Sequence, residues 1–77
     1  MEMTEREGKL IDELWEKAES KGYREQTVEM ALMLACTVEM VEKYGSEENA
    51  LEEIVKLCEK NDSGEKFIAE VGALIGV

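Results

Sequence analysis

The stretch that decides the fold is EQTVEMALMLACTVEMVEKY, residues 25–44. Its apolar residues would occupy nearly every side of a helix. The polar stripe that remains consists of Glu25, Glu29, Glu39 and Lys43, and it is interrupted by Leu32 and Cys36. A helix that is apolar nearly all round must be covered nearly all round. The stretch therefore predicts one helix over residues 25–44 at the centre of a helical fold.

Three shorter helices are predicted around this one, because glycines at positions 22, 45 and 64 separate segments with helical spacing of apolar residues. The first begins at the capping-box sequence TERE, residues 4–7, and ends near Lys21. The third follows Ser46, a good N-cap residue, and the fourth follows Asp62-Ser63-Gly64. These boundaries predict helices over about 4–21 and 25–44, a third helix that starts after Ser46 and a fourth that starts after Gly64.

Each of the three outer helices has one apolar face. The predicted buried residues are Leu10, Ile11, Leu14, Trp15 and Ala18 in the first helix, Ala50, Leu51, Ile54, Val55, Leu57 and Cys58 in the third, and Phe67, Ile68, Val71, Leu74 and Ile75 in the fourth. We therefore predict an all-α fold, a small four-helix bundle with the helix over 25–44 in its centre. Residues 1–77 are expected to form a single acidic helical domain.

A chain of 77 residues buries only about 60% of the surface that its unfolded form exposes. Small domains often gain stability by associating, and the helix over 25–44 has more apolar surface than three short helices readily cover. We therefore predict a homo-oligomer, a dimer in its simplest form. The residues predicted to mediate this self-association are Leu32 and Cys36, together with the small residues Ala69, Gly72, Ala73 and Gly76.

The chain contains no histidine, the residue most often used as a general base and as a metal ligand. Cys36 and Cys58 lie singly inside apolar helical patterns and form no metal-binding pair. No glycine-rich phosphate loop or calcium-binding loop is present. The sequence therefore predicts a protein that is not an enzyme and has no catalytic residue, metal site or cofactor.

The first residues, MEMTE, lack the pattern of a secretory signal. The longest apolar run, residues 30–38, is about half of the roughly 20 residues needed to cross a bilayer. We therefore expect a soluble cytoplasmic protein without a membrane partner.

Nineteen acidic residues against nine basic ones give a net charge of −10. Binding to phosphates depends on cationic patches that release counterions, and no segment of the chain is basic. Direct binding to nucleic acid is therefore not expected. A basic protein is the partner that this charge favours.

The acidic residues form two uncompensated edges when the helices are drawn at 100° per residue. One edge lies beside Trp15 and the other beside Val55. The edge beside Trp15 consists of Asp12, Glu16 and Glu19, and the edge beside Val55 consists of Glu48, Glu52 and Glu59. If the bundle brings them to one side, they form an acidic face that docks a basic partner, so we predict a regulatory protein-protein interaction. An ordinary solvated surface, or a nucleic-acid mimic such as some phage-encoded inhibitors, would also account for them.

Length, acidity and four helices are also features of acyl carrier proteins. In that family Asp-Ser-Leu opens the second helix, whereas this chain has Asp62-Ser63-Gly64 before its last helix. The sequence does not match the family motif. A carrier role, with Ser63 as the attachment point, is kept only as a further alternative.

Overall fold

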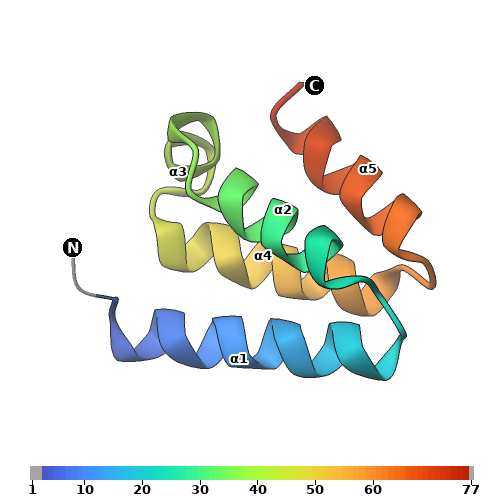
Figure 1. The fold of residues 1–77 in the computed structure, drawn as a ribbon. Helices are drawn as coiled ribbons and strands as arrows, with labels where there is room; N and C mark the ends of the chain where they lie inside the picture. The colour runs from blue at the N-terminus through green and yellow to red at the C-terminus, as the bar shows by residue number, and fades with distance from the viewer. Residues whose placement is uncertain (1–2, 77) are drawn as a thin grey trace.

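The structure is a computed structural model and describes residues 3–76. This part of the chain folds into five helices without any strand (Figure 1). The helices are α1 (Glu5–Ser20), α2 (Glu25–Ala35), α3 (Val38–Tyr44), α4 (Glu47–Lys60) and α5 (Gly64–Leu74). The predicted all-α class is therefore confirmed.

The ends of α1 follow from its sequence. The Thr4 hydroxyl accepts a hydrogen bond from the Glu7 backbone N–H at 3.1 Å, and the Glu7 carboxylate accepts one from the Thr4 N–H at 3.4 Å. This is the predicted capping box, which satisfies two amides that lack helical partners. Beyond the C-cap, Gly22 has a φ of +74°, a left-handed conformation that glycine adopts without steric cost.

The prediction of four helices is wrong because the segment 25–44 is not one helix. Helix α2 ends at Ala35, and α3 begins at Val38 after a turn at Cys36 and Thr37. The Thr37 hydroxyl donates a hydrogen bond to the Leu34 carbonyl at 2.7 Å and accepts one from the Met40 N–H at 3.4 Å. Threonine side chains that bond to nearby backbone groups compete with the helix, and here Thr37 becomes the N-cap of α3.

The prediction that helix 2 is central is not confirmed either. Among residues 3–76, helix α4 packs against each of the other four helices and contributes six of the 14 buried hydrophobic residues, whereas α2 contributes three. These six are Ala50, Leu51, Ile54, Val55, Leu57 and Cys58, so the predicted buried face of this helix is confirmed. The core is therefore organised around α4, and much of α2 faces outward.

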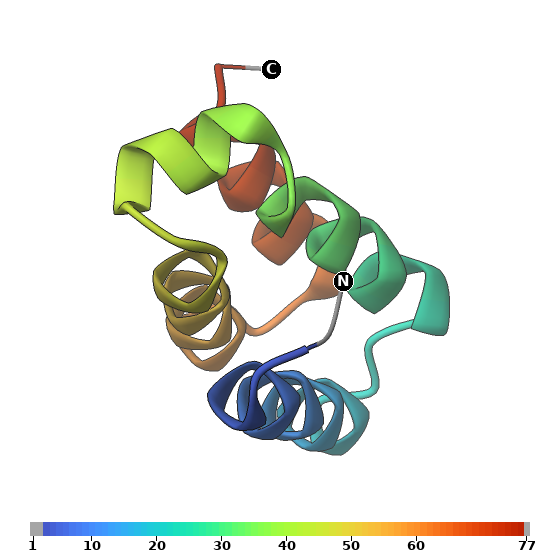
Figure 2. The ribbon, with the colours of Figure 1, turned by 90° about the vertical axis from the view of Figure 1, so that its left-hand side faces the viewer.

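Helices α1 and α4 run in the same direction and α2 runs opposite to both (Figure 1). The view along α1 shows α4 on one side of it and α2 on the other (Figure 2). Helix α1 packs far more extensively on α4 than on α2. We call the side of the molecule where α1 approaches α2 the α1–α2 face.

The C-terminal end of α4 is joined to the α1–α2 loop and to α5. The Asn61 carbonyl accepts hydrogen bonds from Lys21 Nζ at 2.6 Å and from the Tyr23 hydroxyl at 2.5 Å. The Tyr23 ring stacks on Phe67 of α5, with a distance of 5.6 Å between the ring centroids. These contacts fix the position of Tyr23, which lines two cavities described below.

Candidate partner-binding site

The acidic edge of α4 is compensated within the molecule. Lys17 of α1 forms an ion pair with Glu59, with 2.8 Å between Nζ and Oε1. Arg6 of α1 forms ion pairs with Glu48, at 3.7 Å, and with Glu52. Because α1 and α4 are parallel, the basic flank of α1 follows the acidic edge of α4 along its length. Glu48, Glu52 and Glu59 thus lie in a partly exposed charged seam between α1 and α4.

The seam also shifts the pKa values of two of its members, Glu59 and Lys17. The hydrogen bond from Lys17, followed by the charge of that residue, lowers the pKa of Glu59. The same hydrogen bond raises the pKa of Lys17. Both shifts favour the charged forms of the two groups, as expected for an ion pair.

The acidic edge of α1 remains open. Asp12, Glu16 and Glu19 are exposed, and within residues 3–76 none of them forms an ion pair. At 100° per residue Asp12 and Glu19 lie on the side of α1 away from Arg6 and Lys17, whereas Glu16 points outward and lines a surface hollow together with Lys17. The structure therefore does not unite the two predicted edges, because one faces solvent and the other pairs with α1.

Two further acids that the sequence reasoning did not assign to a site are found near this edge. Glu25 and Glu29 of α2 are exposed and are likewise without an ion pair in the described part of the chain. Glu25 lines the same cavity as Glu19 of α1. Glu25 and Glu29 belong to the polar stripe of segment 25–44, and this stripe is the sequence signal that could have identified them.

A cavity of about 290 Å³ on the α1–α2 face combines aromatic and acidic walls. We call it the Trp15 cavity. It is lined by Trp15, Ala18, Glu19, Tyr23, Glu25 and Val28. Trp15 is half-buried, so part of its surface is available to a ligand. A cation is the complementary ligand, because carboxylates attract it and an aromatic ring face binds it through the ring quadrupole.

A second cavity, of about 240 Å³, lies toward the other end of α1 and is mainly apolar. We call it the Leu32 cavity. It is lined by Met3, Glu7, Ile11, Leu32, Cys36, Glu47 and Leu51. Leu32 and Ile11 are only partly buried, because α2 and α1 do not close over them. An apolar side chain is the ligand that such walls favour.

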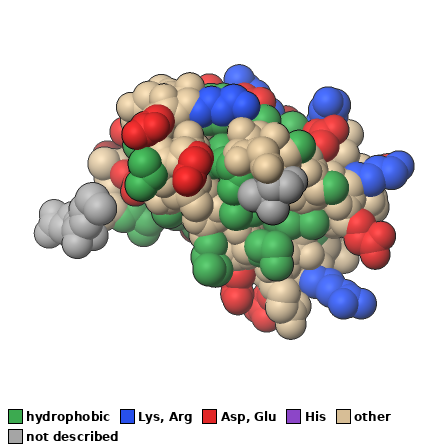
Figure 3. Space-filling view, turned by 90° about the horizontal axis from the view of Figure 1, so that it is seen from above, with side chains coloured by type: hydrophobic (Ala, Val, Ile, Leu, Met, Phe, Trp, Pro, Cys, Tyr) green, Lys and Arg blue, Asp and Glu red, His purple; other side chains and the backbone are tan. Residues whose placement is uncertain are grey.

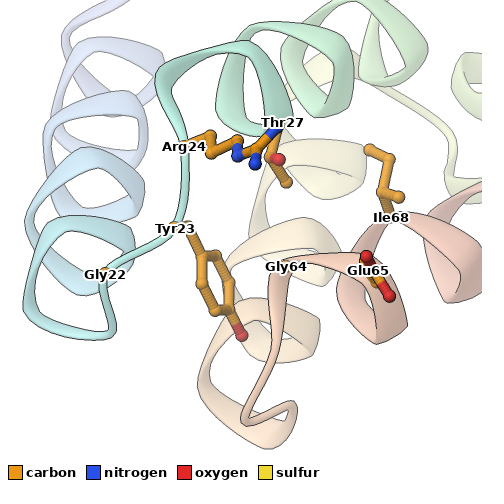
Figure 4. A pocket seen from close by; sticks show the side chains of 7 residues that line it. All are labelled: Gly22, Tyr23, Arg24, Thr27, Gly64, Glu65 and Ile68. Carbon is orange, nitrogen blue, oxygen red and sulfur yellow. The ribbon is translucent and has the colours of Figure 1, made fainter.

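A third cavity, of about 300 Å³, lies on the other side of the α1–α2 loop (Figure 4). It is lined by Gly22, Tyr23, Arg24, Thr27, Gly64, Glu65 and Ile68. Arg24 and Glu65 extend from opposite sides of it (Figure 4). Because these two side chains bring opposite charges, this cavity does not favour a ligand of either sign.

The two cysteines differ in access. Cys36 is exposed at the Leu32 cavity and Cys58 is buried in the core. Partial burial, followed by the charges of Glu47 and Glu7, raises the pKa of the Cys36 thiol. Since the thiolate is the reactive form, this raised pKa predicts slow reaction of Cys36.

We expect a disulfide reagent at neutral pH to modify only Cys36 in the folded protein, and more slowly than it modifies a free thiol of ordinary pKa. Cys58 should react only after unfolding. Reaction of the reagent with the wild type and with Cys36→Ser checks this by absorbance. Two fast thiols in the folded wild type would contradict both the burial of Cys58 and the raised pKa of Cys36.

The residues predicted to mediate self-association fall into two groups. Leu32 and Cys36 line the Leu32 cavity, whereas Ala69, Gly72 and Ala73 belong to α5, which packs on the opposite flank of α2. Gly76 follows α5 and is exposed. Three other apolar residues, Met30, Met33 and Val38, are largely exposed on α2 and α3. Figure 3 shows that hydrophobic side chains gather near the middle of the face seen from above. Self-association through these residues stays a prediction.

Within residues 3–76 no helix is both long enough and apolar enough to cross a membrane. In the same residues no three Cys, Asp or Glu side chains are placed to hold a metal ion. The described residues form a small all-helical fold with an acidic, partly apolar α1–α2 face. No protein-family model, curated protein or solved structure matches this chain.

Proposed function

We propose that the protein is a non-catalytic, regulatory binding module that docks a basic segment of a partner protein on its α1–α2 face. The observation that carries this proposal is the unequal compensation of charge around α1. Arg6 and Lys17 of α1 pair with acids of α4, whereas Asp12, Glu16 and Glu19 have no ion pair among the described residues.

The physical reason is that unpaired carboxylates beside an apolar surface attract a complementary cationic segment. Like-charged neighbours on one helix face slightly destabilise the helix, so the edge of α1 adds nothing to stability by itself. A bound basic segment would relieve this repulsion, and its attraction would act over about 8 Å at physiological salt. Trp15 adds the aromatic surface that is typical of the centre of protein interfaces.

Fluorescence titration tests this proposal directly, because Trp15 is the only tryptophan. The probe is an amphipathic peptide of lysine and leucine, about four helical turns long and without aromatic residues. We expect saturable binding that changes Trp15 emission. Binding should weaken by about tenfold, the equivalent of ~1.4 kcal/mol, in the double variant Glu16→Lys and Glu19→Lys.

The matched control is Glu39→Lys with Glu42→Lys on α3. Both pairs are exposed and three residues apart, and each double variant changes the net charge by four, from −10 to −6. The control should lose much less affinity than the α1 variant. Equal losses would show that the peptide responds only to total charge, and absence of saturable binding would contradict the proposal.

Two alternatives are narrower or weaker proposals for the same chain. In nucleic-acid mimicry the basic segment would be the phosphate-binding groove of the partner, but pairing of the α4 acids with α1 leaves fewer free charges for such a role. For a carrier role, Ser63 is the candidate attachment residue. Its hydroxyl already caps α5 by accepting a hydrogen bond from the Lys66 N–H at 3.2 Å.

A further inference from the structure

The α1–α2 face has two cavities of different chemistry at a fixed distance from each other. The Trp15 cavity has carboxylates and aromatic rings in its walls, and the Leu32 cavity is mainly apolar. A partner that filled both would need a cationic side chain and an apolar side chain at matching positions. The spacing of the two cavities therefore constrains the sequence of the partner.

Both helices include a spacing of seven positions. On α1 the wall residues of the two cavities lie four to twelve positions apart, and Ala18 and Ile11, near the middle of this range, are seven apart. On α2 and the Cys36 that follows it, the wall residues lie four to eleven positions apart, and Glu25 and Leu32 are seven apart. At 1.5 Å per residue, seven positions correspond to about 10 Å along either helix.

We infer that the partner segment is an amphipathic helix with an arginine or lysine and a large aliphatic residue seven positions apart. Residues seven positions apart lie on the same side of a helix, and about 10 Å separates them. The cationic side chain enters the Trp15 cavity between Glu19 and Glu25, and the aliphatic one enters the Leu32 cavity. This inference rests on the proposed function and specifies the partner that the face accepts.

The positions of the carboxylates favour a cationic side chain of the partner helix in the Trp15 cavity. Glu19 comes from α1 and Glu25 from α2, so the two carboxylates approach the Trp15 cavity from different helices. The Tyr23 hydroxyl already donates its hydrogen bond to the Asn61 carbonyl. It is therefore not free to donate a hydrogen bond to Glu19 or Glu25. A guanidinium has several donors and also stacks on aromatic rings, so it satisfies both features together.

Peptides of equal composition test the spacing. Each contains one arginine and one leucine on the same side of an otherwise polar, neutral helix, placed four, seven or eleven positions apart. Their separations along the helix are about 6, 10 and 16 Å. We expect the peptide with spacing seven to bind at least about tenfold more tightly than the other two, measured by Trp15 fluorescence.

Two further measurements identify which cavity each side chain occupies. Replacing arginine by citrulline, which has the same shape without the charge, should weaken the spacing-seven peptide about tenfold. The double variant Glu19→Gln with Glu25→Gln should weaken it similarly, whereas Glu39→Gln with Glu42→Gln on α3 should not. Saturating peptide should also slow alkylation of Cys36, which lines the Leu32 cavity.

The outcomes separate this inference from the proposed function. If the lysine-leucine peptide binds and depends on Glu16 and Glu19, but the three spacings bind equally, the two-cavity inference is overturned and the docking function stands. If the spacing-seven peptide leaves Cys36 alkylation unchanged, occupation of the Leu32 cavity is contradicted. If no basic peptide binds, the proposed function itself fails.

Discussion

Replacing Phe67 by alanine is expected to destabilise the folded state by about 3–5 kcal/mol. Phe67 is fully buried in the described structure, and its ring stacks on Tyr23. The substitution removes the apolar contacts of a complete ring and leaves a cavity between α5 and the α1–α2 loop. Domains of this length have a total stability of about 4–12 kcal/mol, so the variant should lose a large part of its stability, and all of it if the wild type lies at the lower end of this range.

Urea denaturation followed by circular dichroism measures this effect. Phe67→Leu is the matched control, because it keeps most of the apolar contacts and loses only the stacked ring, so it should cost much less than the alanine variant. A loss of under about 1 kcal/mol for Phe67→Ala would contradict the burial of this residue and the docking of α5.

The starts and apolar faces of the shorter helices could be predicted because their signals are local. The capping box at Thr4 and the N-cap at Ser46 act within a few residues of the helix start, and the structure shows both. The buried face of α4 was also predictable, since one apolar stripe on an otherwise charged helix can point only toward a core.

The segment 25–44 shows where this reasoning fails. Continuous apolar composition predicts burial but cannot show whether one helix or two provide it. Thr37 interrupts the helix because its hydroxyl bonds to the Leu34 carbonyl, and the turn lets α3 bury Met40 against α4. A single threonine is compatible with a continuous helix, so the break depends on packing that the sequence pattern does not encode.

The acidic edges were incompletely predictable for a related reason. Helical periodicity places Glu48, Glu52 and Glu59 on one flank of their helix and Arg6 and Lys17 on one flank of another. It does not say that the two helices run parallel and that these flanks meet. The pairing between helices decides which acids are free for a partner, and it depends on the tertiary arrangement alone.

The central position of α4 gives the second large expected effect. We expect Ile54→Ala to destabilise the protein by about 2–5 kcal/mol, because Ile54 is fully buried and its truncation leaves a cavity in the helix that contacts all others. Met33→Ala on α2 should change stability by less than about 0.5 kcal/mol, since 73% of Met33 is exposed.

This pair of variants separates the two possible centres of the fold, and denaturant unfolding of both proteins under the same conditions provides the comparison. A bundle built around segment 25–44 would bury Met33 and make its truncation costly. The structure instead predicts a large difference between the two variants, with Ile54→Ala much the less stable. Similar losses for both would mean that the outward face of α2 is covered in solution, as the predicted self-association requires, and in that case the cost at Met33 would depend on protein concentration.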